Sequence, residues 1–291
     1  MKCERLLSLS LIAILLMANT DYAFALCSSN DSKAKIQAVR SKHTSTKVHA
    51  KIPFSVNTKD TQIIWRGKRW QADYEFLNID YPSGIEEAPI TNGYLHMFRG
   101  GYAGKLASNN SSVLLWEILP TLAVSSNQLK NPSKIELGSF RIDAHLIWKV
   151  ILQKFSYHVG VCSNALTGEY LLIPALGIAF QDSHWALSIA YPRSSAAVQL
   201  NSVATLFSGW SLSGNVWEIL DSELQNRSDL QFESQKLEIG LRFRYPDRGV
   251  IEFGWSYRFE QQLRYLARNG SQQRVHVGNN NGWNLSYKYL L

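Results

Sequence analysis

The sequence predicts an all-β protein built as a single transmembrane antiparallel β-barrel. Two observations carry this prediction. Long segments alternate apolar and polar residues with a period of two, so each would form a strand with one apolar and one polar face. Several of these segments run about 8–11 residues, close to the length at which a tilted strand crosses a bilayer. A soluble secreted β-sandwich that binds a ligand stays open as an alternative, although shorter strands are typical of that fold.

Residues 1–25 resemble a secretory signal peptide, because two basic residues precede an apolar run that ends at Met17. The small residues of "AFA" predict cleavage after Ala25. Two other interpretations stay open. The run could remain as an N-terminal anchor, for which it is short. Cys27 could carry a lipid, although the bulky Leu26 before it suits that modification poorly.

Composition narrows the class further. The formal net charge is +7, from 30 Lys and Arg against 23 Asp and Glu. Cleavage would leave only Cys27 and Cys162, so an exported chain would have no disulfide framework, which fits a bacterial envelope. Whether these two cysteines pair stays open. A basic chain can bind nucleic acid, but export makes nucleic acid an unexpected partner.

Residues 26–60 are polar, basic and rich in Ser and Thr, and we predict a periplasmic lead-in there. The barrel is predicted over residues 61–291. Its clearest strands are "RWQADYEFL", "FRIDAHLIWKV", "LEIGLRFRY" and "IEFGWSYRF", with turn signals such as "PDRG" and "GNNNG" between strands. Bacterial barrels have an even number of strands, and the candidate segments favour about 10 or 12.

Charged side chains lie on the polar faces of these strands. A charge that faces lipid near the bilayer midplane costs up to about 2–4 kcal/mol, so these groups are expected in the lumen. The predicted lumen is net basic, and its possible basic lining residues are Arg141, Lys149, Arg242, Arg244, Arg258 and Lys288. One hypothesis is a small, porin-like channel that favours anions. The other is a non-conducting structural or interaction barrel, because small barrels leave little free bore.

Two stretches resemble an uncharacterised family of bacterial outer-membrane β-barrel proteins. They are "YLLIPALGIAFQDSHWALSIAYPRSSAAVQL" and "GLRFRYPDRGVIEFGWSYRFEQQLRY". The signature residues are Pro174, Leu176 and Gly177, followed by Tyr191, Pro192 and Arg193. The resemblance covers roughly residues 60–291. It implies the outer membrane of a Gram-negative-type bacterium, with lipid and lipopolysaccharide as partners, and it implies no activity or ligand.

The segment "WNLSYKYLL" at residues 283–291 presents one apolar face and one polar face. The apolar face carries Trp283, Leu285, Tyr287, Tyr289 and Leu291. Resemblance to outer-membrane proteins implies that the barrel assembly machinery recognises this strand, with Leu291 in the place of the usual Phe. In the signature region, Pro192 is expected to end a strand. Arg193 would then lie at the membrane rim, near lipid phosphates.

The sequence predicts no catalytic residue, no cofactor and no metal ligand. His184 lies beside Ser183 and Asp182, but neighbours on a turn do not point toward one another as a triad requires. His145 and His158 lack further ligands at metal-binding spacing. "FRGGYAGK" lacks the spacing of a phosphate-binding loop. We therefore expect a protein that is not an enzyme, and its oligomeric state stays open.

Overall fold

The computed structural model describes residues 36–45, 58–66, 69–79, 93–109, 111–221, 223, 225–245, 249–267 and 269–289. In these ranges the chain forms strands β1 (Ile36–Ser45), β2 (Thr58–Arg66), β3 (Trp70–Ile79), β4 (Tyr94–Asn109), β5 (Ser112–Ser125), β6 (Phe140–Leu152), β7 (Phe155–Asn164), β8 (Leu171–Gln181), β9 (Trp185–Tyr191), β10 (Arg193–Gln199), β11 (Ala204–Leu220), β12 (Arg227–Tyr245), β13 (Gly249–Leu266), β14 (Gln272–Val277) and β15 (Asn280–Tyr289). The connection between β5 and β6 contains α3 (Ser126–Lys130), η1 (Pro132–Lys134) and η2 (Leu137–Ser139).

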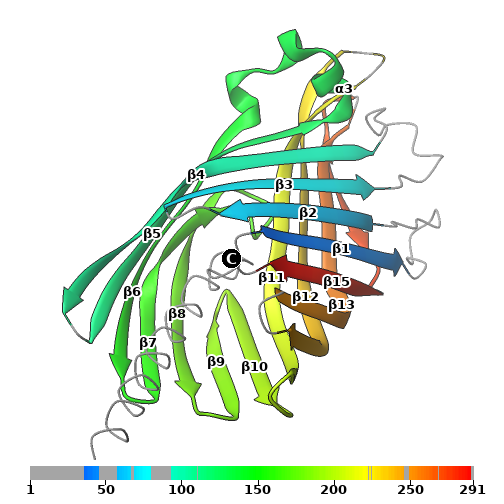
Figure 1. The fold of residues 1–291 in the computed structure, drawn as a ribbon. Coiled ribbons are helices and arrows are strands. Elements are labelled where there is room, and N and C mark those ends of the chain that lie inside the picture. Colours follow the sequence, from blue (N-terminus) through cyan, green and yellow to red (C-terminus); the bar gives the residue numbers. More distant parts are fainter. Residues whose placement is uncertain are drawn as a thin grey trace, which may run out of the picture.

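The strands form a closed antiparallel barrel (Figure 1). Each strand from β1 to β13 pairs with the next one in sequence, and β15 closes the ring by pairing with both β1 and β13. β14 pairs with β13 beyond the end of β15, so β14 and β15 lie end to end along one neighbour. Fourteen described strands therefore make the ring, and β14 is an additional one.

The prediction of 10 or 12 strands is wrong, and the physical reason lies in the strands without large apolar side chains. β1 reads "IQAVRSKHTS" and β10 reads "RSSAAVQ", so neither shows an alternation of large apolar residues. β1 also falls inside the predicted lead-in 26–60, of which residues 36–45 instead belong to the barrel. The predicted signal peptide and Cys27 lie outside the described residues, whereas Cys162 is buried in β7.

The two ends of the barrel differ. At one end the strands are joined by connections of two to four residues, as between β6 and β7 or between β8 and β9; we call it the turn end. β1 begins and β15 finishes at this end, where Ile36 pairs with Tyr289. The opposite end, called the loop end, carries the longer connections, including the one with α3. No helix in the described part of the chain is long and apolar enough to span a membrane.

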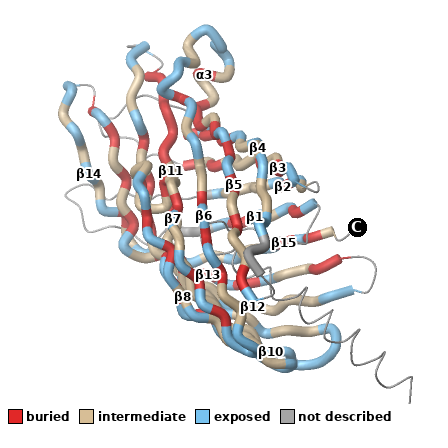
Figure 2. The backbone as a smooth tube through the Cα atoms, turned by 90° about the vertical axis from the view of Figure 1, so that its left-hand side faces the viewer, coloured by how far each residue is buried: buried red, intermediate tan, exposed pale blue. Residues whose placement is uncertain are grey.

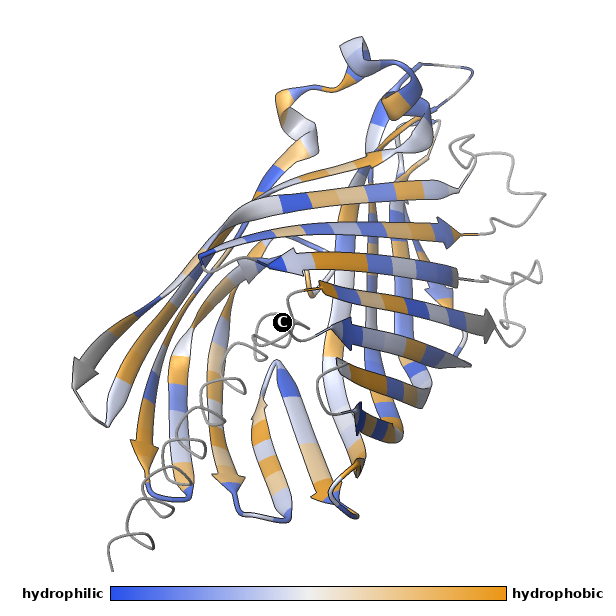
Figure 3. Ribbon diagram, in the orientation of Figure 1, coloured by the Kyte–Doolittle hydropathy of each residue, from blue (hydrophilic) through white to orange (hydrophobic). Residues whose placement is uncertain are grey.

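Large apolar side chains cover the outside of the barrel. Exposed examples from around the ring are Trp65, Tyr102, Ile118, Trp148, Leu176, Ile189, Phe253 and Trp255. The predicted apolar face of the last strand lies here as well, with Trp283, Leu285 and Tyr287 exposed; Leu291 is outside the described residues. Apolar and polar colours alternate along the strands in Figure 3, and Figure 2 shows buried positions along β5, β6 and β11. The outside is therefore apolar, while much of the inside is polar.

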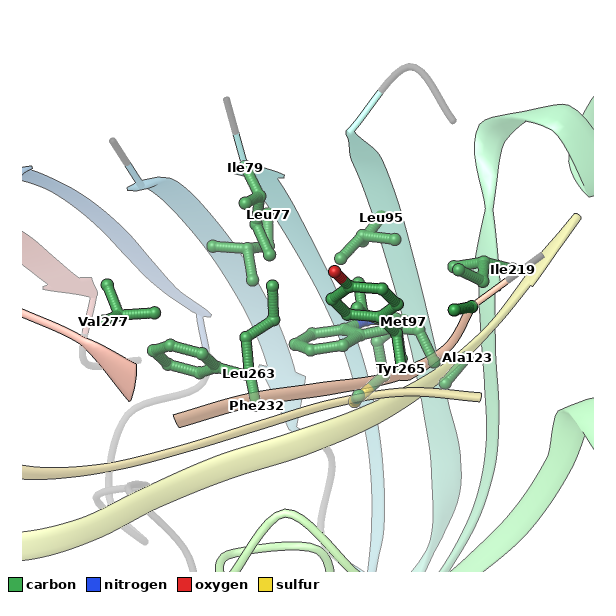
Figure 4. Close-up of a cluster of buried hydrophobic side chains, with 13 residues drawn as sticks. Leu77, Ile79, Leu95, Met97, Ala123, Ile219, Phe232, Leu263, Tyr265 and Val277 are labelled. Carbon is green, nitrogen blue, oxygen red and sulfur yellow. The ribbon is translucent and has the colours of Figure 1, made fainter. Parts of the chain in front are cut away.

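The loop end is filled by an apolar cluster, which we call the apolar cap (Figure 4). It consists of Leu77, Ile79, Leu95, Met97, Ala123, Trp217, Ile219, Leu230, Phe232, Leu263, Tyr265, Ala267 and Val277. These residues bring the loop-end parts of β3, β4 and β5 against those of β11, β12 and β13, which lie across the ring. A parallel bridge between Val124 of β5 and Glu218 of β11 fixes this approach. An apolar core therefore lies at the loop end of the barrel.

The strands of the ring are shortest at β9 and β10, which have seven residues each, whereas β11 has seventeen. β8 pairs with β9 only from Leu176 onward. Pro174, which looks out of place inside a strand, therefore has a neighbour on one side only and removes no donor from a second ladder. Above the hairpin, the connection 165–170 packs on β11 at Gly214.

Gly214 tests this packing. A Cβ atom there would lie 2.5 Å from the carbonyl oxygen of Leu166 and 2.7 Å from that of Ala165, so the backbone of the connection would have to move. We expect Gly214→Ala to destabilise the barrel by about 1–3 kcal/mol. The midpoint of the heat-induced shift in gel mobility measures the loss. Gly100→Ala is the control, because its Cβ would meet nothing closer than 3.9 Å. Equal midpoints for both variants would contradict the packing.

Candidate functional site

The candidate site is the lumen, a cavity of about 510 Å³ lined by inward side chains from most of the ring. Thirteen charged side chains are part of its described lining. Seven are basic, namely Arg99, Arg193, Lys236, Arg242, Arg244, Arg258 and Lys288. Six are acidic, namely Asp60, Glu75, Glu117, Asp143, Glu238 and Glu252. The lining is thus close to neutral, with one more basic group than acidic ones.

The six basic residues proposed from sequence lie in three different places. Arg242, Arg244, Arg258 and Lys288 line the cavity. Lys149 is buried on the inner side of β6, beside a small pocket that Ser156 and Gln181 also line. Arg141 lies at the loop end of β6, where it contacts Asp229 at 3.3 Å. The sequence predicts Arg193 at the membrane rim. In the structure, Arg193 instead lines the cavity from the first position of β10.

The signs of charge are separated around the ring. On β2 to β6, four carboxylates gather around the single guanidinium of Arg99; they belong to Asp60, Asp73, Glu75 and Asp143, and we call this set the acidic wall. Arg99 donates to Asp73 at 3.0 Å and to Glu75 at 2.5 Å, and it lies 3.5 Å from Asp143. Three more negative than positive charges remain on this wall when all four carboxylates are ionised.

Two side chains from outside this group donate hydrogen bonds to the acidic wall. Asn215 of β11 donates a hydrogen bond to Glu75 at 3.0 Å, which links β3 to the opposite side of the ring. Tyr170, from the connection between β7 and β8, donates to Asp143. Burial, together with the nearby carboxylate, raises the pKa of Tyr170, so the phenol stays protonated as a donor. The carboxylates of the acidic wall are therefore contacted from β4 by Arg99, from β11 by Asn215 and from the connection between β7 and β8 by Tyr170.

The opposite side of the lumen carries the basic residues. Arg193 pairs in register with Ser211, Ser211 with Lys236, and Lys236 with Arg258, so four adjacent strands place these side chains in one row. We call Arg193, Lys236 and Arg258 the basic row. Neighbouring strands lie about 4.8 Å apart, which brings the cations close together.

A second tier of charges lies nearer the turn end. There Glu252 accepts from Arg242 at 2.6 Å and from Lys288 at 3.0 Å. Between the two tiers, Gly240 and Gly254 pair in register, and the ring of Phe207 and the amide of Asn284 lie where their Cβ atoms would be. The basic side of the lumen is thus built from a row with a net positive charge and a mostly paired tier below it.

The other candidates from sequence lie on two separate parts of the barrel, the turn between β8 and β9 and the strand β6. Ser183 and His184 are 2.8 Å apart on an exposed turn, but the carboxylate of Asp182 accepts from Lys154 at 2.8 Å, which lowers the pKa of Asp182. His145 lies on β6 beside Glu117, at 3.2 Å. Within the described ranges, no group of three His, Cys, Asp or Glu side chains is placed to hold a metal ion.

Comparison with known proteins gives similarity of architecture only. No protein-family model matches the chain, and no curated protein sequence is significantly similar to it. Among solved structures, the chain is similar to the NanC porin, with 7% identity over 88% of this chain and 100% of that one and a TM-score of 0.40. It is similar to the toluene transporter TodX of Pseudomonas putida, with 10% identity, coverage of 87% and 89%, and a TM-score of 0.37. OmpT, an outer membrane protein of Vibrio cholerae, gives 9%, coverage of 88% and 96%, and 0.31. At these values the similarities assign no function.

Arg99 is the test of the acidic wall. Replacing it with Met leaves several buried carboxylates without their counter-charge, and we expect a loss of about 3–5 kcal/mol in stability. Chemical denaturation followed by Trp fluorescence measures this loss. Adding Asp143→Asn to Arg99→Met should recover part of it, because one uncompensated carboxylate disappears. Arg244→Met is the control at the exposed turn end, and a similar loss in both single variants would contradict the assignment.

Proposed function

We propose that the protein is an outer-membrane β-barrel that acts as a narrow channel for small polar solutes. The observation that supports this most is the charged cavity inside a ring whose outer surface carries exposed Trp, Leu, Ile and Phe side chains. An apolar band around a polar interior is the pattern of barrels that span the outer membrane. Short periplasmic turns are typical of such barrels, so the turn end would face the periplasm.

The proposal includes partners that follow from the same surface. The apolar band would contact outer-membrane lipid and the acyl chains of lipopolysaccharide. The barrel assembly machinery would insert the chain by its last strand. The family resemblance in residues 170–200 is also part of this proposal. Its signature residues Pro174, Tyr191 and Arg193 lie on β8, β9 and β10, where the strands of the barrel are short.

Ion selectivity tests the channel. Arg258 is buried and lines the lumen, so its charge acts in a poorly screened environment, whereas Arg244 is exposed at the turn end. In planar bilayers with a salt gradient, we expect Arg258→Glu to shift the reversal potential toward cation preference by clearly more than Arg244→Glu does. Both variants change the charge by the same amount. A barrel with native gel mobility that passes no current would refute the channel, and equal shifts would refute the role of Arg258.

The apolar cap supports a second candidate function, a non-conducting barrel with a structural or interaction role. The cap closes the loop end with tightly buried side chains, of which Trp217 is 1% exposed. In that case the wild type would be closed, and Trp217→Ala, which removes a large side chain from the cap, should raise conductance. Ile189→Ala on the outer surface should leave conductance unchanged. An open wild type with the same conductance as Trp217→Ala would contradict this candidate. The truncation also costs about 3–5 kcal/mol, so native gel mobility must be checked first.

A further inference from the structure

We propose that the lumen holds a binding site for small zwitterions, solutes that carry one carboxylate and one ammonium group. The basic row would hold the carboxylate and the acidic wall the ammonium. The inference deepens the proposed channel function, because it names the class of solute that the lumen would take. It stands on the placement of charges and on buried polar atoms of both sides that have no partner in the described structure.

The carboxylate end of the site is the basic row. Arg258 is 7% exposed and lines the cavity, and its Nε atom is buried without a hydrogen-bond partner among the described residues. Arg193, at the other end of the row, forms no ion pair in the described part of the chain. Lys236 between them shares its charge with Glu238 at 2.7 Å. Two guanidinium groups are therefore available to a carboxylate, and such charge-assisted pairs are stronger than neutral hydrogen bonds.

The ammonium end is the acidic wall. Its four carboxylates outnumber the guanidinium of Arg99, and the other cations within electrostatic range are Arg66 for Asp73 and Arg258 and Lys236 for Asp60. Asp60 and Asp143 each have a buried Oδ1 atom without a hydrogen-bond partner in the described ranges. Both residues line the cavity. A lysine-like ammonium group has three donors and could donate to either acceptor.

The two ends lie within reach of one solute. Asp60 is within electrostatic range of both Arg258 and Lys236. The strand register runs from Asp60 through Ser41 of β1 and Asn284 of β15 to Gly254 of β13, four residues before Arg258. Each ion pair in the described part of the lumen joins residues of the same side. The fields of the two sides therefore add across the cavity.

This field discriminates between solutes. The basic row attracts an anion, but the acidic wall repels it. A cation is attracted by the acidic wall and repelled by the basic row. A zwitterion aligned across the lumen gains at both ends, and these gains are large where water is displaced. One charge-assisted contact changes affinity by about tenfold or more.

The test measures binding to the full-length, detergent-folded protein by isothermal titration at low salt. The three probes are ε-aminocaproate, which carries both charges, and caproate and hexylamine, which carry one each on the same carbon chain. We expect ε-aminocaproate to bind at least about tenfold more tightly than either single-charge probe. Affinity of ε-aminocaproate no higher than that of caproate or hexylamine would overturn the proposal.

Variants assign the two ends. We expect Arg258→Gln and Asp60→Asn each to weaken ε-aminocaproate binding by about tenfold, while Lys154→Gln, on the exposed turn between β6 and β7 and outside the cavity lining, has little effect. Native gel mobility of each variant shows that the barrel is folded. Undiminished affinity in both folded lumen variants would overturn the proposal. Binding without any ion current would support this inference while refuting the channel. Current without preferential binding would refute this inference alone.

Discussion

The pairing of β1 with β15 is the constraint on which the rest of the structure depends. A sheet of fourteen strands has two open edges, and unpaired backbone groups at such edges are costly in a membrane. Ten residue pairs, from Ile36 with Tyr289 to Ser45 with Asn280, remove both edges. Closure also decides which side chains face each other, because it brings the acidic wall of β2 to β6 opposite the strands of the basic row. The charged cavity is thus a consequence of this seam.

Unequal strand lengths shape the lumen along its axis. β9 and β10 reach only part of the way up the wall, so the loop-end half of β11 has no partner on that side and approaches β5 instead. The approach packs β11 to β13 against β3 to β5 and produces the apolar cap. The connection 165–170 then covers the other side of β11. The cavity is therefore polar in its middle and at the turn end, and an apolar core lies at the loop end.

The sequence was sufficient for the fold class, because few folds other than a membrane barrel combine period-two alternation with aromatic residues along one face of so many long strands. It was insufficient for the strand number, since β1 and β10 lack that signal. The prediction that apolar strand faces point outward also fails near the apolar cap. Leu95, Met97 and Arg99 share one face of β4, and this face is inward, so apolar residues point inside where the general rule places them outside. A rule that assigns apolar faces to lipid cannot find Arg99.

The basic row shows a different limit of sequence reasoning. Arg193, Lys236 and Arg258 are far apart in the chain, and nothing in their local sequence relates them to one another. Their alignment depends on the register of three strand pairs, and a slip of one residue in any of them would turn a side chain toward lipid. Alternation alone predicts Arg258 in the lumen, but only the structure shows that its buried Nε atom has no hydrogen-bond partner among the described residues.

The separation of charge requires a physical reason, because alternating positive and negative side chains would have a lower electrostatic energy. The tier of Arg242, Glu252 and Lys288 shows that this barrel pairs opposite charges when they lie on adjacent strands. In the acidic wall four carboxylates face one guanidinium, and in the basic row only Lys236 is paired, with Glu238; this excess of like charge on each side raises the electrostatic energy of the lumen. A solute with complementary charges at its two ends would lower that energy on binding. Stability given up in a binding site is a common cost of recognition, since groups arranged for a ligand are not arranged for one another. On this argument, the strained charge distribution is the feature that distinguishes a selective lumen from one that is merely filled.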